Sequence, residues 1–180
     1  MEFLIAKDPS ELEEILYLQE TAVGKGVFAK RKFEVGDTIA LLTGTLIDDP
    51  DYDSCFCIEM GPELSLEPDA PFRFINHSCE PNCCLLSQED EDGNELEEQL
   101  GLYVTTTIYP GEEITIDYAW GSESAIPCLC GSVNCRGWIV CKDEIDDLIE
   151  AKRRERLVIV EYPRFRGFPN PEIIRKPKQD

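Results

Sequence analysis

The stretch RFINHSCEPNCC, residues 73–84, contains the only histidine of the chain, His77, directly before a Ser-Cys pair. An imidazole in this setting has three possible roles: metal ligand, catalytic base or structural hydrogen-bonding group. Three cysteines in the same stretch supply thiolates that a soft metal ion accepts. The stretch alone leaves all three roles open, and the rest of the sequence is needed to choose between them.

The overall composition is that of a globular protein. Of the 180 residues, 42% are hydrophobic and 30% are charged, which fits a single domain with its own core. No apolar run approaches the roughly 20 residues that a membrane helix needs, so no membrane association is expected. The N-terminus, MEFLIAKDPSELEE, lacks a basic start followed by an apolar core. We therefore expect a nuclear or cytoplasmic protein that is not secreted.

The chain carries a net charge of −20. This charge disfavours direct, non-specific binding to nucleic-acid phosphates, so no direct nucleic-acid partner is expected. A field of this sign attracts a basic partner such as a Lys/Arg-rich peptide. The alternative is that the acidic residues only keep the protein soluble. The one concentrated basic patch is AKRRER, residues 151–156.

The pattern of apolar and polar residues predicts helices near both ends of the chain. The stretch DPSELEE begins with a capping aspartate and a proline, which is typical of a helix start. Residues 142–156 have apolar side chains at helical spacing, with acids early and bases late, as the helix dipole favours. The next stretch, LVIVEY at residues 157–162, is typical of a last strand, and the tail after it is expected to be extended.

The middle of the chain is predicted to be rich in strands and turns. Residues 102–109 and 113–118 are two β-rich runs on either side of a Pro-Gly turn. Residues 48–71 are rich in aspartate and proline and predict an irregular or variable segment. The acidic run at residues 89–98 predicts a solvated loop or the tip of a hairpin.

A second group of cysteines indicates a metal site. The number of cysteines, nine, is odd, and without a secretory signal reduced thiols or metal ligands are favoured over a disulfide framework. In CLCGSVNCRGW, residues 128–138, three cysteines follow a C-x-C-x4-C pattern, which suits tetrahedral zinc. Three buried thiols without a metal are the alternative. Candidates for a fourth ligand are Cys55, Cys57, Cys79, Cys83, Cys84, Cys141 and His77.

Four motifs in this order resemble one protein family. They are GKGVFA at residues 24–29, RFINHSCEPN at 73–82, PGEEITIDY at 110–118 and CLCGSVNCRGW at 128–138. Together they resemble the SET-domain family of protein lysine methyltransferases, and the last motif resembles the family's post-SET zinc motif. The resemblance runs from about residue 17 to about residue 140, which is most of the chain.

The resemblance implies a mostly β fold of small curved sheets. In it, the NHSC and DY segments meet in a knot-like crossing, followed by a zinc-bound post-SET segment and a C-terminal helix. The expected organisation is a helical lead-in at residues 1–16, a SET domain at 17–122, a post-SET zinc motif at 123–141, and a C-terminal helix with an extended tail at 142–180.

The resemblance also implies a pocket for S-adenosylmethionine and a zinc site. The expected cofactor-binding residues are Lys25, Gly26, Val27, Arg73, Phe74, Asn76, His77 and Trp138. The expected zinc ligands are Cys79, Cys128, Cys130 and Cys135, so that Cys79 supplies the missing fourth thiolate. His77 is then neither base nor ligand: it would form a hydrogen bond across the crossing and offer its backbone to the cofactor.

The implied activity is S-adenosylmethionine-dependent methylation of lysine in a basic protein, with a histone tail as first candidate. Tyr118 stands at the position of the family's essential tyrosine. Two residues depart from the family pattern: Leu42 replaces a usual tyrosine, and Ile116 replaces a usual Phe or Tyr that governs the number of methyl groups added. A smaller aliphatic side chain at 116 favours di- or trimethylation. The alternatives are a non-histone substrate, or an inactive module that binds a basic partner.

Overall fold

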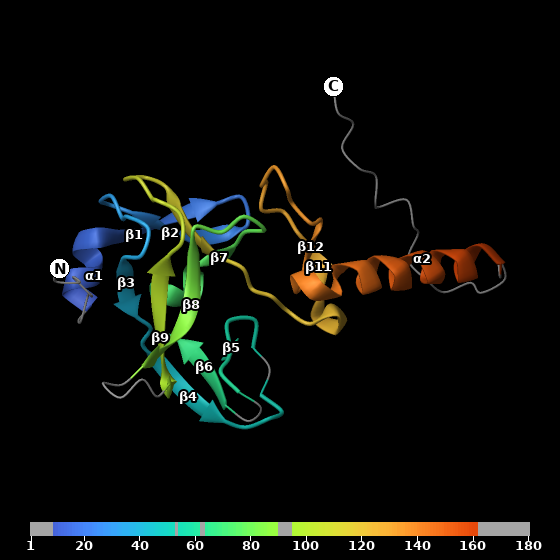
Figure 1. Ribbon diagram of the computed structural model, residues 1–180, viewed down its shortest axis with the longest axis horizontal. Helices are drawn as coiled ribbons and strands as arrows, with labels where there is room; N and C mark the ends of the chain where they lie inside the picture. The colour runs from blue at the N-terminus through green and yellow to red at the C-terminus, as the bar shows by residue number, and fades with distance from the viewer. Residues whose placement is uncertain (1–8, 53, 62–63, 90–94, 162–180) are drawn as a thin grey trace.

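Small sheets, rather than one large sheet, form the body of the chain (Figure 1). The computed structural model describes residues 9–52, 54–61, 64–89 and 95–161. Within these residues the strands form sheets in the orders β1-β2-β10-β7, β3-β9-β8, β4-β6-β5 and β11-β12. The strands are β1 (Leu16–Thr21), β2 (Gly24–Ala29), β3 (Thr38–Leu41), β4 (Gly44–Asp48), β5 (Ile58–Glu59), β6 (Leu64–Pro68), β7 (Asn76–His77), β8 (Cys83–Glu89), β9 (Glu95–Val104), β10 (Glu113–Ile116), β11 (Ile126–Pro127) and β12 (Trp138–Ile139).

The first sheet brings together segments that are far apart in the sequence. β1 and β2 form an antiparallel hairpin that turns at Gly24, whose φ of 119° is in the left-handed region that glycine tolerates. β10 pairs antiparallel with β2 on one side and parallel with β7 on the other. The GKGVFA, NHSC and EEITIDY motifs therefore meet in one small sheet.

A continuous hydrophobic core lies beneath the first two sheets. Its members come from α1 (Pro9–Ile15), β1, β2, β3, β8, β9, β10, the 3-10 turn at Phe72–Phe74 and the connections between these elements. Phe33, Ile39, Leu102, Ile108 and Ile114 are fully buried. Burying side chains of this size stabilises the fold by about 1.5–3 kcal/mol each, before the entropy cost of ordering them. This core holds the motif-bearing strands in place.

The prediction of an irregular segment at residues 48–71 is wrong in part. β4 pairs with β6, and β6 pairs with β5, so that this segment contributes to a three-stranded antiparallel sheet. The aspartates and prolines stand mainly in the connections, and the strands are short. Figure 1 shows this sheet at the lower end of the molecule, away from α1 (Pro9–Ile15).

The predicted run at residues 102–109 begins earlier and ends earlier than expected. β9 starts at Glu95 and ends at Val104, while Ile108 forms a separate bridge with Phe33. β8 and β9 pair antiparallel with an irregularity between Ser87 and Gln88, so the acidic run lies at the end of a hairpin. The tip itself, residues 90–94, lies outside the described residues.

The two predicted helices are present. α1 begins at Pro9, as the sequence indicates, while Asp8 lies outside the described residues. α2 runs from Ile145 to Glu161 after a 3-10 turn at Lys142–Glu144, and it projects away from the sheets (Figure 1). No helix in the described part of the chain is long and apolar enough to cross a membrane.

The predicted last strand at residues 157–162 is wrong. Residues 157–161 continue α2, and residue 162 and the tail lie outside the described residues. No glycine or proline interrupts the chain between Lys142 and Glu161. Adding a residue to an existing helix costs little compared with starting a new element, so the helix continues through residues that favour strands in isolation.

Candidate functional site

A parallel crossing of β7 and β10 forms the centre of the site. Asn76 pairs with Thr115 and His77 pairs with Ile116. Beyond the strand, the backbone N–H of Ser78 donates to the Ile116 carbonyl at 2.9 Å. Segments that are about 40 residues apart in sequence are therefore held together by main-chain hydrogen bonds, as the expected crossing requires.

The side chain of Asn82 stabilises this crossing through hydrogen bonds to the backbone of β10. Its side-chain Nδ2 donates to the Glu113 carbonyl at 2.8 Å, and its Oδ1 accepts from the Thr115 N–H at 2.9 Å. Its own carbonyl accepts from the N–H groups of Thr105 and Thr106. Asn82 belongs to the RFINHSCEPN motif, but no role for its side chain was predicted from the sequence. Its partners, Glu113 and Thr115, are more than 30 residues away in sequence, so the role becomes visible only in the folded chain.

Asn76, Gly26 and Glu113 form a tightly packed cradle at the edge of the first sheet. Asn76 Nδ2 donates to Glu113 Oε1 at 2.7 Å and to the Lys25 carbonyl at 3.1 Å. A Cβ added to Gly26 would lie 2.3 Å from Glu113 Oε1 and 3.1 Å from Asn76 Nδ2. Position 26 therefore admits only glycine while this pair is intact. Glu113 is a site residue that sequence reasoning missed, because PGEE alone indicates only a turn.

The remaining residues expected to bind a cofactor lie in four places. Lys25 Nζ lies 5.3 Å from the Phe74 ring centroid, so these two are neighbours at the same edge as Asn76. Arg73 turns towards the β4-β6-β5 sheet, where Nη2 lies 3.1 Å from Glu67 Oε1 and the guanidinium lies 4.5 Å from the Phe56 ring. Val27 is fully buried in the core. Trp138 is half-buried in β12, paired with Pro127 of β11.

Tyr118 follows β10 and is fixed by both its hydroxyl and its backbone. Its hydroxyl donates to the Ile75 carbonyl at 2.8 Å, and its N–H donates to His77 Nδ1 at 3.2 Å. Its ring lies 5.4 Å from that of His77 and 5.2 Å from that of Trp120. Burial raises the pKa of Tyr118 to about 12, so the hydroxyl is protonated at neutral pH.

His77 is neutral and joins the crossing to the cysteines. Burial lowers its pKa. Because Nδ1 accepts from the Tyr118 N–H, the proton of the neutral ring lies on Nε2, which is 3.4 Å from Cys79 Sγ. The 3.5 Å approach of Asp117 to Nδ1 is therefore not an ion pair. The predicted hydrogen bond across the crossing is present.

Four thiols converge beside the crossing. The Sγ atoms of Cys79, Cys128, Cys130 and Cys135 all lie within 4.8 Å of one another. The Cys79 Sγ is 3.7 Å from that of Cys128 and 3.9 Å from that of Cys135. A tetrahedral zinc ion with Zn–S bonds of about 2.3 Å requires sulfur–sulfur distances of about 3.8 Å. The set therefore fits zinc in both geometry and ligand chemistry.

The thiols of the cluster differ in acidity. Burial raises the pKa of Cys79 and of Cys128. Burial opposes ionisation of Cys130, but its hydrogen bond with the Ser132 hydroxyl and contacts with neighbouring groups lower the pKa of Cys130 to about 6. One thiolate is thus available near neutral pH, before a metal displaces further protons. Cys83 lies outside the cluster, fully buried, and burial raises its pKa to about 12.

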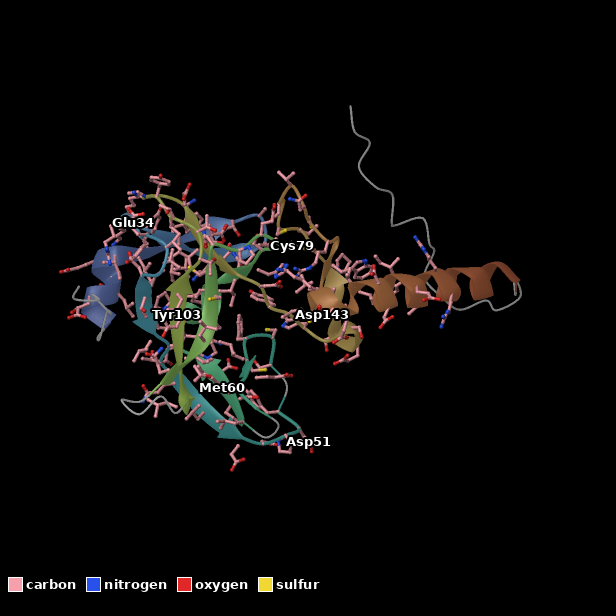
Figure 2. All side chains as sticks on the ribbon, viewed as in Figure 1. Glu34, Asp51, Met60, Cys79, Tyr103 and Asp143 are labelled. Atoms are coloured by element: carbon pink, nitrogen blue, oxygen red, sulfur yellow. The ribbon has the colours of Figure 1, made fainter. Side chains whose placement is uncertain are left out.

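Several contacts tie the cysteine-rich segment to the sheets. Figure 2 shows Cys79 between the body of the chain and the segment that leads to α2. Asn134 Nδ2 donates to Glu80 Oε1 at 2.6 Å, and the hydroxyls of Ser78 and Ser132 lie 2.9 Å apart. A bidentate ion pair joins Arg136 to Asp117. Sequence reasoning missed these pairs, because each joins residues that are remote in the chain.

Comparisons with known proteins agree with this geometry. The family model of the SET domain matches residues 24–119, more than half of the chain. The chain therefore belongs to the SET-domain family.

Among curated relatives, the histone-lysine N-methyltransferase ASHR3 of Arabidopsis thaliana is 35% identical over 113 residues, which cover 60% of this chain and 20% of the relative. An H3 lysine-4-specific histone-lysine N-methyltransferase of Cryptococcus neoformans is 40% identical over 73 residues, covering 37% of this chain and 5% of the relative. The chain thus spans only a small part of these relatives' own length.

Solved structures of KRYPTONITE share the fold. One, in complex with mCHG DNA and SAH, has a TM-score of 0.60 and is 26% identical in sequence. The match covers 69% of this chain and 28% of the KRYPTONITE chain. Another, in complex with mCHH DNA, an H3(1–15) peptide and SAH, has a TM-score of 0.56 at the same identity, covering 69% and 29%.

Proposed function

We propose that the chain is an S-adenosylmethionine-dependent protein lysine N-methyltransferase. The observation that carries this proposal is the crossing itself, which brings Asn76, Tyr118 and the four-thiol cluster to one place. The SAH in the KRYPTONITE structures and the names of the curated relatives support it. The division into lead-in, SET, post-SET and C-terminal parts remains part of the proposal.

Asn76 is proposed to recognise the amino group of the cofactor. Both hydrogens of its Nδ2 are used within the protein, by Glu113 Oε1 and by the Lys25 carbonyl. Only Oδ1 remains as an acceptor for a ligand, which suits an ammonium donor. Glu113 therefore sets the orientation of the amide. The Lys25–Phe74 edge and the backbone at His77 complete the proposed binding surface, with Trp138 as its cover.

Tyr118 is proposed to orient the reacting groups, not to remove a proton. With a pKa of about 12, its hydroxyl stays protonated and is held by the Ile75 carbonyl at 2.8 Å. The cofactor supplies an electrophilic methyl group on sulfur. A free lysine has a pKa of about 10.4, and an apolar channel disfavours its charged form. The protein's contribution is then alignment and exclusion of water.

The four-thiol cluster is proposed to hold a structural zinc ion. Cys79 belongs to the crossing, whereas the other three ligands belong to the segment after it. A metal bound by all four would fix that segment against the site. The ligand set is closed, with four protein donors, which is typical of structural zinc sites rather than catalytic ones.

The proposed substrate is a basic protein, with a histone tail as first candidate. The net charge of −20 favours such a partner, and exposed acids at Asp48, Asp51 and Glu59 lie on the β4-β6-β5 segment. The H3 peptide in a KRYPTONITE complex and the relatives' names support a histone. A histone substrate accords with a nuclear location, and a non-histone basic protein remains the alternative substrate.

An inactive module that binds a basic partner is the rival function, and Leu42 is the feature that favours it. Leu42 stands where the family usually has tyrosine, and it packs against the hydrophobic core. Its N–H donates to the Leu100 carbonyl, which extends the β3–β9 pairing by one residue. The intact Tyr118 contacts favour the enzyme.

The test is incubation of the chain with isotope-labelled S-adenosylmethionine and a panel of core histones, with mass spectrometry of labelled lysines. A matched panel of tailless histones is the control. Labelled lysine in the tailed set alone would support a histone-tail methyltransferase. Cofactor binding without transfer to any basic protein would favour the inactive module.

A further inference from the structure

Arg136 makes a paired contact with the residue directly before Tyr118. Its Nη1 donates to Asp117 Oδ2 at 2.8 Å and its Nη2 donates to Asp117 Oδ1 at 2.7 Å. The Arg136 side chain is 11% exposed and that of Asp117 is 19% exposed. Although burial opposes ionisation of Asp117, the guanidinium keeps its pKa below the usual range. The pair is thus ionised, bidentate and mostly shielded from water.

On the Asp117 side, the pair controls the turn that contains Tyr118. Asp117 Oδ1 also accepts from the Ala119 N–H at 3.2 Å. Ala119 has a φ of 48°, in the left-handed region that a residue with a side chain rarely adopts. The hydrogen bond from the Ala119 N–H to the Asp117 carboxylate offsets part of the energy cost of this backbone conformation. The next residue, Trp120, packs against Tyr118, with the two ring centroids 5.2 Å apart and the rings tilted by 35°.

On its other side, Arg136 is attached to the cysteine cluster. It follows Cys135 directly, and its backbone N–H donates to Cys79 Sγ at 3.4 Å. Four thiolates around one zinc ion carry a net charge of −2, which a nearby guanidinium offsets. The backbone position of Arg136 therefore depends on whether Cys79 and Cys135 are held together by a metal.

We propose that Arg136 is a positioning residue that links metal occupancy of the four-cysteine cluster to the orientation of Tyr118. When the four thiols share a metal, the guanidinium is held where both of its terminal nitrogens reach Asp117. When the metal is removed, the 128–137 segment loses this anchor and the carboxylate loses its partner. The inference rests on the proposed function, since it takes zinc as the metal and Tyr118 as the group at the transferring methyl.

A second tether supplies a matched control. Asn134 also joins this segment to the body, through its hydrogen bond to Glu80 Oε1. It lies in the same loop but has no contact with Asp117 or Tyr118 among those found in the described residues. If the loop only needs to be anchored, Arg136→Ala and Asn134→Ala should both disturb the Tyr118 region. If Arg136 acts specifically through Asp117, only Arg136→Ala should disturb it.

Steady-state kinetics give the first expected result. Arg136→Ala should keep about one zinc per chain and nearly unchanged cofactor affinity, while kcat falls about tenfold to a hundredfold, as small misplacements of reacting groups do. Asn134→Ala should retain near-normal kcat. In a double-mutant cycle, Asp117→Asn should add little to Arg136→Ala, because the two residues act as one unit.

Fluorine NMR of protein labelled with 5-fluorotryptophan tests the link without using activity. The chain has two tryptophans, and Trp138→Phe assigns the signal of Trp120. In the wild type and in Asn134→Ala, metal chelation should move the Trp120 signal. In Arg136→Ala the signal should already be displaced, and chelation should move it little further.

An Arg136→Ala signal at the wild-type position, with the same response to chelator, would overturn the proposal. So would an equal displacement in Asn134→Ala. If Arg136→Ala does not fold, Arg136→Gln, which keeps a side-chain amide donor, is measured against the same two outcomes. Failure of the proposed function is seen separately, in a wild-type chain without bound zinc or without methyl transfer.

Discussion

Asn76 Nδ2 and Glu113 Oε1 are joined by a 2.7 Å hydrogen bond across 37 positions of sequence. The bond connects the NHSC motif to the PGEE motif, and the Cβ-free face of Gly26 packs directly on it. Three motifs thus determine one another's geometry at this point. The orientation of the Asn76 amide, and with it the proposed recognition of the cofactor, depends on Glu113.

The first prediction concerns Gly26. In Gly26→Ala the new methyl group would lie 2.3 Å from Glu113 Oε1 and 2.9 Å from Thr21 Cγ2, so the Asn76–Glu113 pair must move. Overpacking of this kind costs about 1–3 kcal/mol, which corresponds to a loss of about fivefold to 150-fold in cofactor affinity when the cost falls on the binding site. Isothermal titration with S-adenosylhomocysteine measures it.

Gly61→Ala is the matched control for that prediction. A Cβ at Gly61 meets nothing within 4 Å, so cofactor affinity should be unchanged. Equal affinities for Gly26→Ala and the wild type would show that the cradle does not bind the cofactor.

The second prediction concerns the metal. The purified chain should contain about one zinc, and Cys130→Ser should lose most of it, because a hydroxyl is a poor replacement for a zinc thiolate. Cys84→Ser, a change at a half-buried cysteine outside the cluster, should retain it. Elemental analysis gives both values. Retention of full zinc content by Cys130→Ser would exclude Cys130 as a ligand.

The third prediction concerns Ile116 and the number of methyl groups. Ile116 is 8% exposed, pairs with His77 and stands two residues before Tyr118. Ile116→Phe adds volume beside the proposed lysine site, so the product should shift towards lower methylation. Ile116→Leu, which conserves volume, should leave the product unchanged. Mass spectrometry at completion measures the product. An unchanged mixture in Ile116→Phe would show that this side chain does not limit the reaction.

The fourth prediction concerns the acidic residues of the β4-β6-β5 segment. Replacing Asp48, Asp51 and Glu59 by their amides should weaken binding of a Lys/Arg-rich peptide. The same peptide should bind the wild type less tightly as salt rises, since exposed charges are screened beyond about 8 Å at physiological ionic strength. Fluorescence anisotropy with a labelled peptide measures both effects. Cofactor affinity should depend on salt much less.

A second triple variant controls for total charge. Replacing Glu13, Glu14 and Glu20 by glutamine removes the same three charges from exposed positions of α1 and β1, at another end of the molecule (Figure 1). Peptide affinity should then remain close to that of the wild type. Equal weakening in both triple variants would mean that the acids act only through net charge.

Much of the fold could be predicted because its motifs are local. GKGVFA forms β2, and the start of the first helix follows from Pro9. Elsewhere, pairing with remote strands decided the outcome: short runs in 48–71, predicted to be irregular, became strands because β4 pairs with β6 and β6 pairs with β5. Residues 157–161, which favour strand in isolation, continued α2. Local propensity could not reveal either outcome.

The candidate site was predicted in part for a similar reason. The convergence of Cys79 with the three later cysteines followed from the resemblance, and the four Sγ atoms do converge. Glu113, Asn82 and Arg136 were not predicted as site residues. Each acts through a partner remote in sequence, and an acid, an amide or a base in a turn has many possible partners until the chain is folded.

The most direct test of the account is Tyr118→Phe, because this change removes only the hydroxyl that donates to the Ile75 carbonyl. Cofactor affinity from titration and the single-turnover rate of methyl transfer should be measured on the same preparation. We predict that affinity changes little while the rate falls by about a hundredfold or more, the pattern of a group that acts in the transition state. Weak cofactor binding with a normal single-turnover rate would contradict the account.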